Sequence, residues 1–260
     1  MNLVLLVILF LLMILIGGKK GLKTFLSLCL NFLVLLITFY FIALGINSII
    51  VSICGCLIIS LVVLFIVNGK NIKTISSMKS VLIVLVILSL GIFVITNMSK
   101  ISGFGYEAYE EINMFSYDIR LKMSDVTTAL ILIGLIGAIL DSSIAISSAL
   151  FEVYENNKYL STKELITSGL NIGKDILGTT TNTLLFAFLG EFMTLLIWFH
   201  TCNYSFTDII NAKVFCSEFI KIMFSAIGCI LVIPITSYIT SLSISRKYVK
   251  FHKKSTISSQ

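Results

Sequence analysis

Two acidic residues lie inside long apolar stretches and are the first candidates for chemistry. Asp141 belongs to the apolar run 126–150, and Glu191 belongs to the later run 179–199. A charged aspartate at the centre of a membrane helix costs about 2.5–3.5 kcal/mol, so it must be neutral, hydrogen-bonded or in contact with water. The pattern leaves two interpretations of Asp141 open: a proton- or cation-binding group on a pathway, or a residue that holds helices together by hydrogen bonds.

Small and hydroxyl-bearing residues recur around both carboxylates at helical spacing. Small faces allow helix backbones to approach closely in lipid, and hydroxyl and amide groups can line a polar path. The predicted path consists of Asp141, Ser142, Ser148, Asn182, Thr183 and Glu191. The predicted packing face consists of Gly134, Gly137, Ala138, Ala145, Ala187 and Gly190. The two carboxylates are expected to differ in depth by about 10 Å at 1.5 Å per residue, as two stations along one path.

The composition indicates that membrane helices must position these residues. Hydrophobic residues make up 57% of the 260 positions and charged residues only 12%, about half the charged fraction of soluble domains. We expect an all-α, polytopic helical bundle that forms one domain over residues 1–260. The net charge of +6 is attributed to basic loops that face anionic lipid, and not to binding of nucleic acid.

Seven spans, one interfacial helix and a basic tail are predicted from the order of the apolar runs. The spans are 3–16, 24–44, 49–67, 81–96, 126–150, 179–199 and 218–244. Between spans five and six, a capping box formed by Ser161 and Glu164 predicts the start of an amphipathic helix, 162–177, at the membrane surface. The tail is 245–260. With the N-terminus outside, the inner segments hold 14 Lys or Arg residues against four outside, so an outside N-terminus and a cytoplasmic C-terminus are favoured.

Signatures of catalysis, metal binding and cofactor binding are missing from the chain. The six cysteines show no C-x-x-C pair and no zinc spacing, so they are interpreted as small buried thiols. The sequence contains no H-E-x-x-H, G-x-S-x-G or P-loop motif. We therefore expect a protein that is not an enzyme and that has no metal site and no cofactor.

The stretch 133–190 contains a series of short motifs: Gly134, Gly137 and Asp141 with Ser147-Ser148, then Ser168-Gly169, then Ile172-Gly173, Asp175 and Gly178-Thr179, and finally Asn182-Thr183-Leu184. Through these residues the stretch resembles the YibE/F-like family of bacterial multi-pass membrane proteins. The early GGKKG (17–21) also suits the family. Family members usually have a valine where this chain has Ser142. The resemblance implies a bacterial cell membrane, a transport-like role and a second, longer family member as a partner.

Two functions from different classes follow from these observations. The first is a permease, or a subunit of one, with Asp141 as its central ion- or proton-sensitive site and Glu191 on the same path. The second is a non-transport scaffold that binds another membrane protein through its small-residue faces, with Asp141 as an interhelical hydrogen-bond lock. In both cases the expected surroundings are the lipid bilayer of the bacterial cell membrane and either the longer family member or further copies of the chain.

Overall fold

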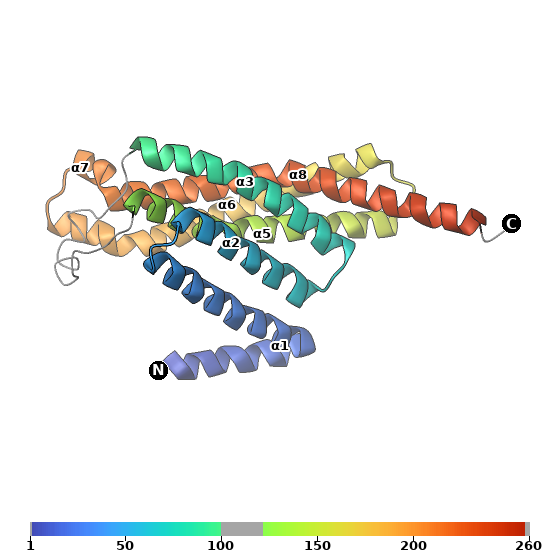
Figure 1. The fold of residues 1–260 in the computed structure, drawn as a ribbon, viewed down its shortest axis with the longest axis horizontal. Coiled ribbons are helices and arrows are strands. Elements are labelled where there is room, and N and C mark those ends of the chain that lie inside the picture. The colour runs from blue at the N-terminus through green and yellow to red at the C-terminus, as the bar shows by residue number, and fades with distance from the viewer. Residues whose placement is uncertain (1, 100–121, 258–260) are drawn as a thin grey trace.

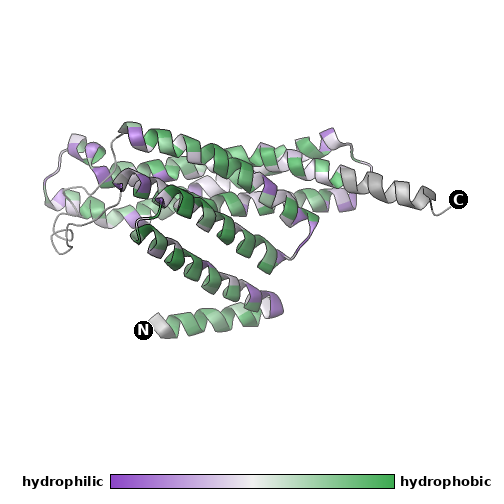
Figure 2. Cartoon of the chain, viewed as in Figure 1, coloured by the Kyte–Doolittle hydropathy of each residue, from purple (hydrophilic) through white to green (hydrophobic). Residues whose placement is uncertain are grey.

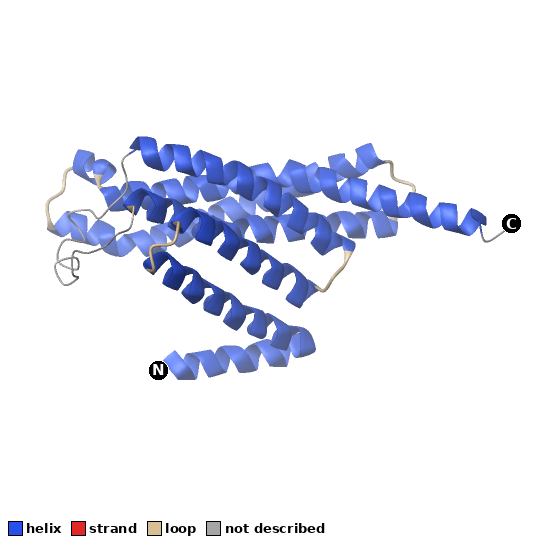
Figure 3. Ribbon diagram, viewed as in Figure 1, coloured by secondary structure: helices blue, strands red, loops and turns tan. Residues whose placement is uncertain are grey.

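The computed structural model describes residues 2–99 and 122–257, and every regular element within them is a helix (Figures 1 and 3). In chain order these are α1 (Asn2–Ala43), α2 (Ser48–Leu61), the π-helical η1 (Val62–Val67), α3 (Ile72–Ser99), α5 (Met123–Asn156), α6 (Thr162–Thr201), α7 (Phe206–Asn211) and α8 (Lys213–Ile257). Six helical stretches within this described part are long and apolar enough to cross a membrane. The prediction of an all-α, multi-pass membrane bundle is therefore confirmed.

The first two predicted spans are the two arms of α1. The helix breaks at Gly18, whose φ of 53° and ψ of −133° are not helical, and the arms turn back on each other there (Figure 1). The rings of Phe10 and Phe25 pack edge-to-face across the arms, with their centroids 4.7 Å apart. Gly21 lies so close to Met13 that a β-carbon would clash with its backbone carbonyl. The polar bend between two apolar arms is visible in Figure 2.

The core of the molecule lies where α2, α3, α5 and α8 meet. Large apolar side chains from these helices pack into one cluster, which includes Leu85, Leu132, Leu135 and Val232. Leu132 and Leu135 are fully buried, so the bulky side of α5 faces inward. The side of α5 that carries its small residues therefore faces away from this core.

The helices α5 and α8 run in the same direction, and α6 runs against them. The first half of α6 packs tightly against α8 because two of its glycines leave room for side chains of that helix. A β-carbon on Gly173 would lie 2.2 Å from Cγ2 of Ile233 on α8, and one on Gly169 would lie 2.6 Å from Oγ of Ser237. The close approach of α6 to α8 therefore requires glycine at both positions.

The predicted separation between an interfacial helix and a sixth span is not present in the structure. Residues 162–177 and 179–199 both belong to the continuous helix α6. The hydroxyls of Thr179 and Thr183 donate to the backbone carbonyls of Ile176 and Thr179, each at 2.9 Å, so the polar residues after Gly178 do not interrupt the helix. The capping box of Ser161 and Glu164 does begin α6, as predicted.

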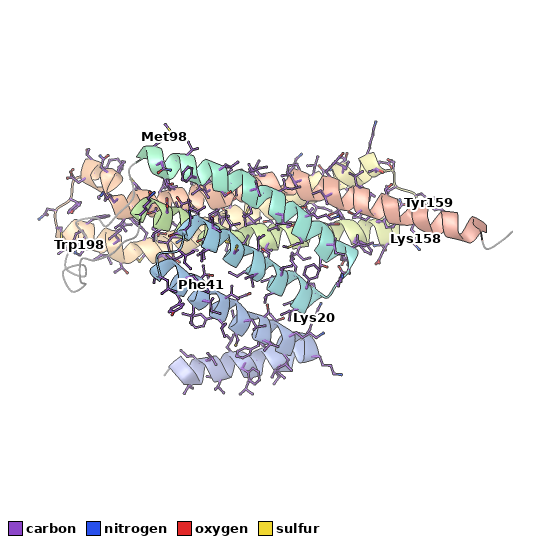
Figure 4. All side chains as sticks on the ribbon, viewed as in Figure 1. Lys20, Phe41, Met98, Lys158, Tyr159 and Trp198 are labelled. Carbon is purple, nitrogen blue, oxygen red and sulfur yellow. The ribbon has the colours of Figure 1, made fainter. Side chains whose placement is uncertain are left out.

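The connections between helices alternate between the two ends of the bundle (Figure 1). The bend of α1, the turn after η1 and the loop between α5 and α6 lie toward one end, and the turns after α1 and α6 lie toward the other. Figure 4 shows Lys158 and Tyr159 near the first end and Trp198 near the second. The side chains of the predicted basic tail, from Arg246 onward, lie outside the described residues.

Candidate functional site

Asp141 lies on the exposed side of α5 in the single chain. Gly134, Gly137 and Ala145 are exposed on the same side, and we call these four residues the small face. A β-carbon on Gly137 would have no neighbour within 4 Å. Within the described part of the single chain no neighbouring helix packs against α5 at Gly137, so the predicted packing face around Asp141 stays a prediction. Gly137 lies open because α5 uses its bulky side to build the core.

The other predicted path residues of α5 do not join Asp141. Ser142 is buried and its hydroxyl donates to Sγ of Cys229 on α8 at 3.5 Å. Ser148 is half-buried, two turns further along the helix. Ala138, at the edge of the small face, is also half-buried. A single helix thus presents its carboxylate outward and its neighbouring serine hydroxyl inward.

Glu191 lies beside a groove between α6 and α8. The groove has a volume of about 410 Å³ and is lined partly by Phe188, Phe192 and Trp198 and partly by Glu191, Thr194 and Glu218. Phe188 and Phe192 stack with their ring centroids 5.2 Å apart, and both are largely buried. Aromatic side chains therefore form its rigid wall, and two carboxylates and a hydroxyl supply its polar groups.

Lys221 connects this groove to the small face. Its Nζ forms an ion pair with Oε2 of Glu218 at 2.8 Å, as the spacing of these two residues on one helix predicts. Its Cε lies 2.9 Å from the position of a β-carbon on Gly134. Gly134 precedes Asp141 by two turns of α5, about 10 Å along the helix axis. Glu218 and Lys221 thus lie between the groove that Glu191 lines and Gly134. The path from there to Asp141, with two separated stations, stays a prediction.

The remaining predicted residues are all exposed on α6. Asn182 and Thr183 lie on its surface, and so do Ala187 and Gly190. A β-carbon on Gly190 would have no neighbour within 4 Å. The predicted packing residues of α6 are thus unpacked in the single chain, as Gly137 of α5 is.

A layer of buried hydroxyls between α3, α5 and α8 was not predicted. The hydroxyl of Ser77 donates to the backbone carbonyl of Ser143 at 3.2 Å, and the hydroxyl of Ser143 lies 3.3 Å from the carbonyl of Ser77 and 3.2 Å from Oγ1 of Thr236. The buried hydroxyls of Ser76 and Thr240 have no partner. Serine and threonine recur in 126–150 and 218–244 and just before the run 81–96, and this recurrence was the signal that could have revealed the layer.

The cysteines and the other metal-binding residue types form no centre in the part of the chain that the structure describes. All six cysteines are free thiols, and Cys56 and Cys229 are buried. The thiol of Cys56 donates to the backbone carbonyl of Leu132 at 3.6 Å. Among residues 2–99 and 122–257, histidine, cysteine, aspartate and glutamate form no group of three or more that could hold a metal ion.

A family model described as YibE/F-like protein matches residues 5–246, which is nearly the whole chain. No curated protein matches the chain. No solved structure matches it. The matched range includes the small face, the groove and the hydroxyl layer.

Proposed function

Because the chain belongs to the YibE/F-like family, we propose that it is a subunit of a membrane permease and that its polar path follows the outer side of α5, α6 and α8. The path begins at the groove beside Glu191, passes the Lys221–Glu218 pair and reaches Asp141. The observation that carries the proposal is the exposure of Asp141 on the small face. A carboxylate in this position needs an environment that lipid does not supply.

A neighbouring protein surface is the environment that suits the small face best. Small residues let a second helix approach closely, and polar groups or water along the seam would satisfy the carboxylate. Gly137, beside which no atom lies within 4 Å of an added β-carbon, and the exposed Ala145 offer the room for such an approach. The path would then lie between two chains, and the second chain would be either a longer family member or another copy of this one.

The proposed setting is the cell membrane of a bacterium, with the N-terminus outside and the C-terminus in the cytoplasm. The basic segments around Lys20 and Lys158 lie toward one end of the molecule (Figure 4). Positively charged loops remain on the cytoplasmic side during insertion. Their common location supports this orientation.

Replacing Asp141 by asparagine distinguishes a permease subunit from a non-transport scaffold. The change keeps the size and hydrogen-bonding capacity of the side chain and removes its negative charge. Cells that lack the protein are complemented with the wild type, Asp141→Asn or the control Asp175→Asn, which alters an exposed aspartate of α6. Ion and metabolite contents of the cells are then compared, and the mass of the purified assembly is measured by light scattering.

The permease predicts that Asp141→Asn assembles as the wild type does but restores no flux, while Asp175→Asn restores it. A variant that loses its assembly partner and its cellular effect together would support the scaffold and contradict the permease. Unchanged flux with Asp141→Asn would also contradict the permease.

A further inference from the structure

The groove between α6 and α8 combines an aromatic wall with a carboxylate that has no counter-ion. Phe188, Phe192 and Trp198 line it, and Glu191 lies among them. Within the described residues, the only ion pair joins Lys221 to Glu218. Glu218 is therefore neutralised by its neighbour, and the negative charge of Glu191 is left over.

The surroundings of Glu191 favour a positively charged occupant. The groove lies along two helices that are long and apolar enough to cross a membrane, where an uncompensated carboxylate is costly. A lipid chain could fill the apolar part of the groove, but it would leave the carboxylate without a partner. A cation would satisfy the charge, and an apolar group attached to it would fill the remaining volume.

Aromatic faces add a second reason for a cation. Quaternary and protonated amines bind to the faces of tryptophan, tyrosine and phenylalanine, and the attraction increases when the site is partly shielded from water. A volume of about 410 Å³ is in the range of small-molecule pockets. A bare metal ion would use neither the volume nor the aromatic wall.

We infer that this groove binds a small organic cation, a protonated or quaternary amine that carries an apolar group, with Glu191 as its counter-ion and Phe188, Phe192 and Trp198 as its aromatic wall. The inference names a class of ligand for the entrance of the proposed path and rests on that proposal only for its role in transport. Binding itself depends on the groove alone.

The position of Trp198 makes the groove directly observable, because this residue is the only tryptophan of the chain. The purified full-length protein in a non-ionic detergent is titrated with benzyltrimethylammonium while tryptophan fluorescence is recorded. Benzenesulfonate, an anion of similar size, is titrated in parallel. We expect a saturable change with the cation and none with the anion.

Three variants complete the test. Glu191→Gln should weaken binding of the cation at least ten-fold, because it removes the counter-ion and keeps the shape. The matched control Glu155→Gln, an exposed acid in the last turn of α5, should bind as the wild type does. Lys221→Gln should bind more tightly, because it releases the charge of Glu218 toward the groove. A general loss of folding would weaken binding in both Glu191→Gln and Lys221→Gln. Opposite changes in affinity would therefore indicate an electrostatic effect.

Several results would overturn the inference. Equal affinity of the wild type and Glu191→Gln would exclude Glu191 as the counter-ion. A linear, unsaturable signal shared by all variants would mean that the cation only partitions into detergent or that lipid fills the groove. Equal binding of benzenesulfonate would exclude charge selection.

The two proposals fail separately. If the cation binds and its affinity changes as predicted in Glu191→Gln and Lys221→Gln, but flux is unchanged in Asp141→Asn, the amine site is retained and the permease is rejected. Loss of flux in Asp141→Asn without binding of the cation would reject the amine site alone.

Discussion

The aliphatic part of Lys221 lies directly against Gly134, with Cε 2.9 Å from the position that a β-carbon would take. This contact joins α8 to the small face of α5, and it holds the ammonium group where it pairs with Glu218. Gly134 on α5 thus helps to set the location of the Lys221 ammonium group on α8. The small face has two parts: Gly134 is covered by Lys221, while Gly137 faces open space.

Replacing each of the two glycines by valine should distinguish the covered part of the small face from the open part. Gly134→Val places methyl groups where the Lys221 chain lies, so we expect a lower melting temperature than that of the wild type. At Gly137 an added β-carbon has no neighbour within 4 Å, so Gly137→Val should not melt below the wild type. If the small face binds a second chain, Gly137→Val should nevertheless reduce the mass of the assembly measured by light scattering. Equal melting temperatures for the two variants would contradict the covering of Gly134.

The close approach of α6 to α8 predicts opposite effects for two glycines of the same helix. Gly173→Ala brings its β-carbon to 2.2 Å from Ile233 and should destabilise the fold by about 1–3 kcal/mol. Gly178→Ala meets nothing within 4 Å and should stabilise α6 by up to about 1 kcal/mol, since alanine favours the helix. Thermal unfolding of both variants in the same detergent provides the comparison. A stabilising Gly173→Ala would contradict the described packing.

The hydroxyl layer predicts a modest loss of stability for Ser143→Ala. The substitution removes the hydroxyl that lies near Ser77 and Thr236 and leaves these groups with fewer partners. Interhelical hydrogen bonds in membranes contribute about 0.6 kcal/mol on average and at most about 1.7 kcal/mol, so the loss should lie in that range. Ser89→Ala is the control, because this exposed hydroxyl bonds only within α3. A loss equal to that of Ser89→Ala would show that the layer does not join the helices.

The orientation of the chain can be tested with fusions to reporter enzymes. A reporter that is active only in the cytoplasm should be active when fused after Gln260, because the predicted inner segments carry most of the basic residues. A reporter that is active only outside should be active when fused after Gly45, in the turn that follows α1. Reversed activities in the two fusions would reject the proposed orientation.

A pH effect is expected at α7, a short helix outside the long apolar stretches. The hydroxyl and backbone N–H of Ser205 donate to the carboxylate of Asp208 and hold the pKa of that carboxyl below its ordinary value. A lowered pKa in the folded state means that the bond stabilises α7 above the ordinary pKa of an aspartate, about 4, and that this stabilisation is lost as the pH falls through the lowered value. Hydrogen exchange of the α7 amides in Asp208→Asn, compared with the wild type, should differ at pH 6 and converge in acid.

The class of fold follows from the sequence because long apolar runs in lipid must satisfy their backbone hydrogen bonds within helices. The start of α6 could also be predicted, since Ser161 and Glu164 satisfy free backbone donors locally. The continuity of α6 through residues 162–201 could not be predicted. The polar run after Gly178 resembles a boundary in composition, yet its threonine hydroxyls bond to carbonyls of the preceding turn and extend the helix.

The site shows the limit of helical periodicity more clearly. Spacing alone places Asp141 and Gly137 on one side of a helix, but it does not say whether that side faces the core. The competing side, with Leu132 and Leu135, buries more apolar surface and therefore points inward. The contact between Lys221 and Gly134 depends on the relative positions of two helices far apart in the sequence, which no local pattern contains.

The bend of α1 at Gly18 also bears on how the chain enters the membrane during synthesis. Residues 1–18 contain no charged side chain, and three lysines lie at or near the bend, at positions 19, 20 and 23. A helical hairpin with its charges at the tip can insert while that tip stays at the surface where it was made. No lysine of α1 then has to be transferred through the hydrocarbon. The first arm and the second arm would thus enter the bilayer as one unit, before the core helices are complete.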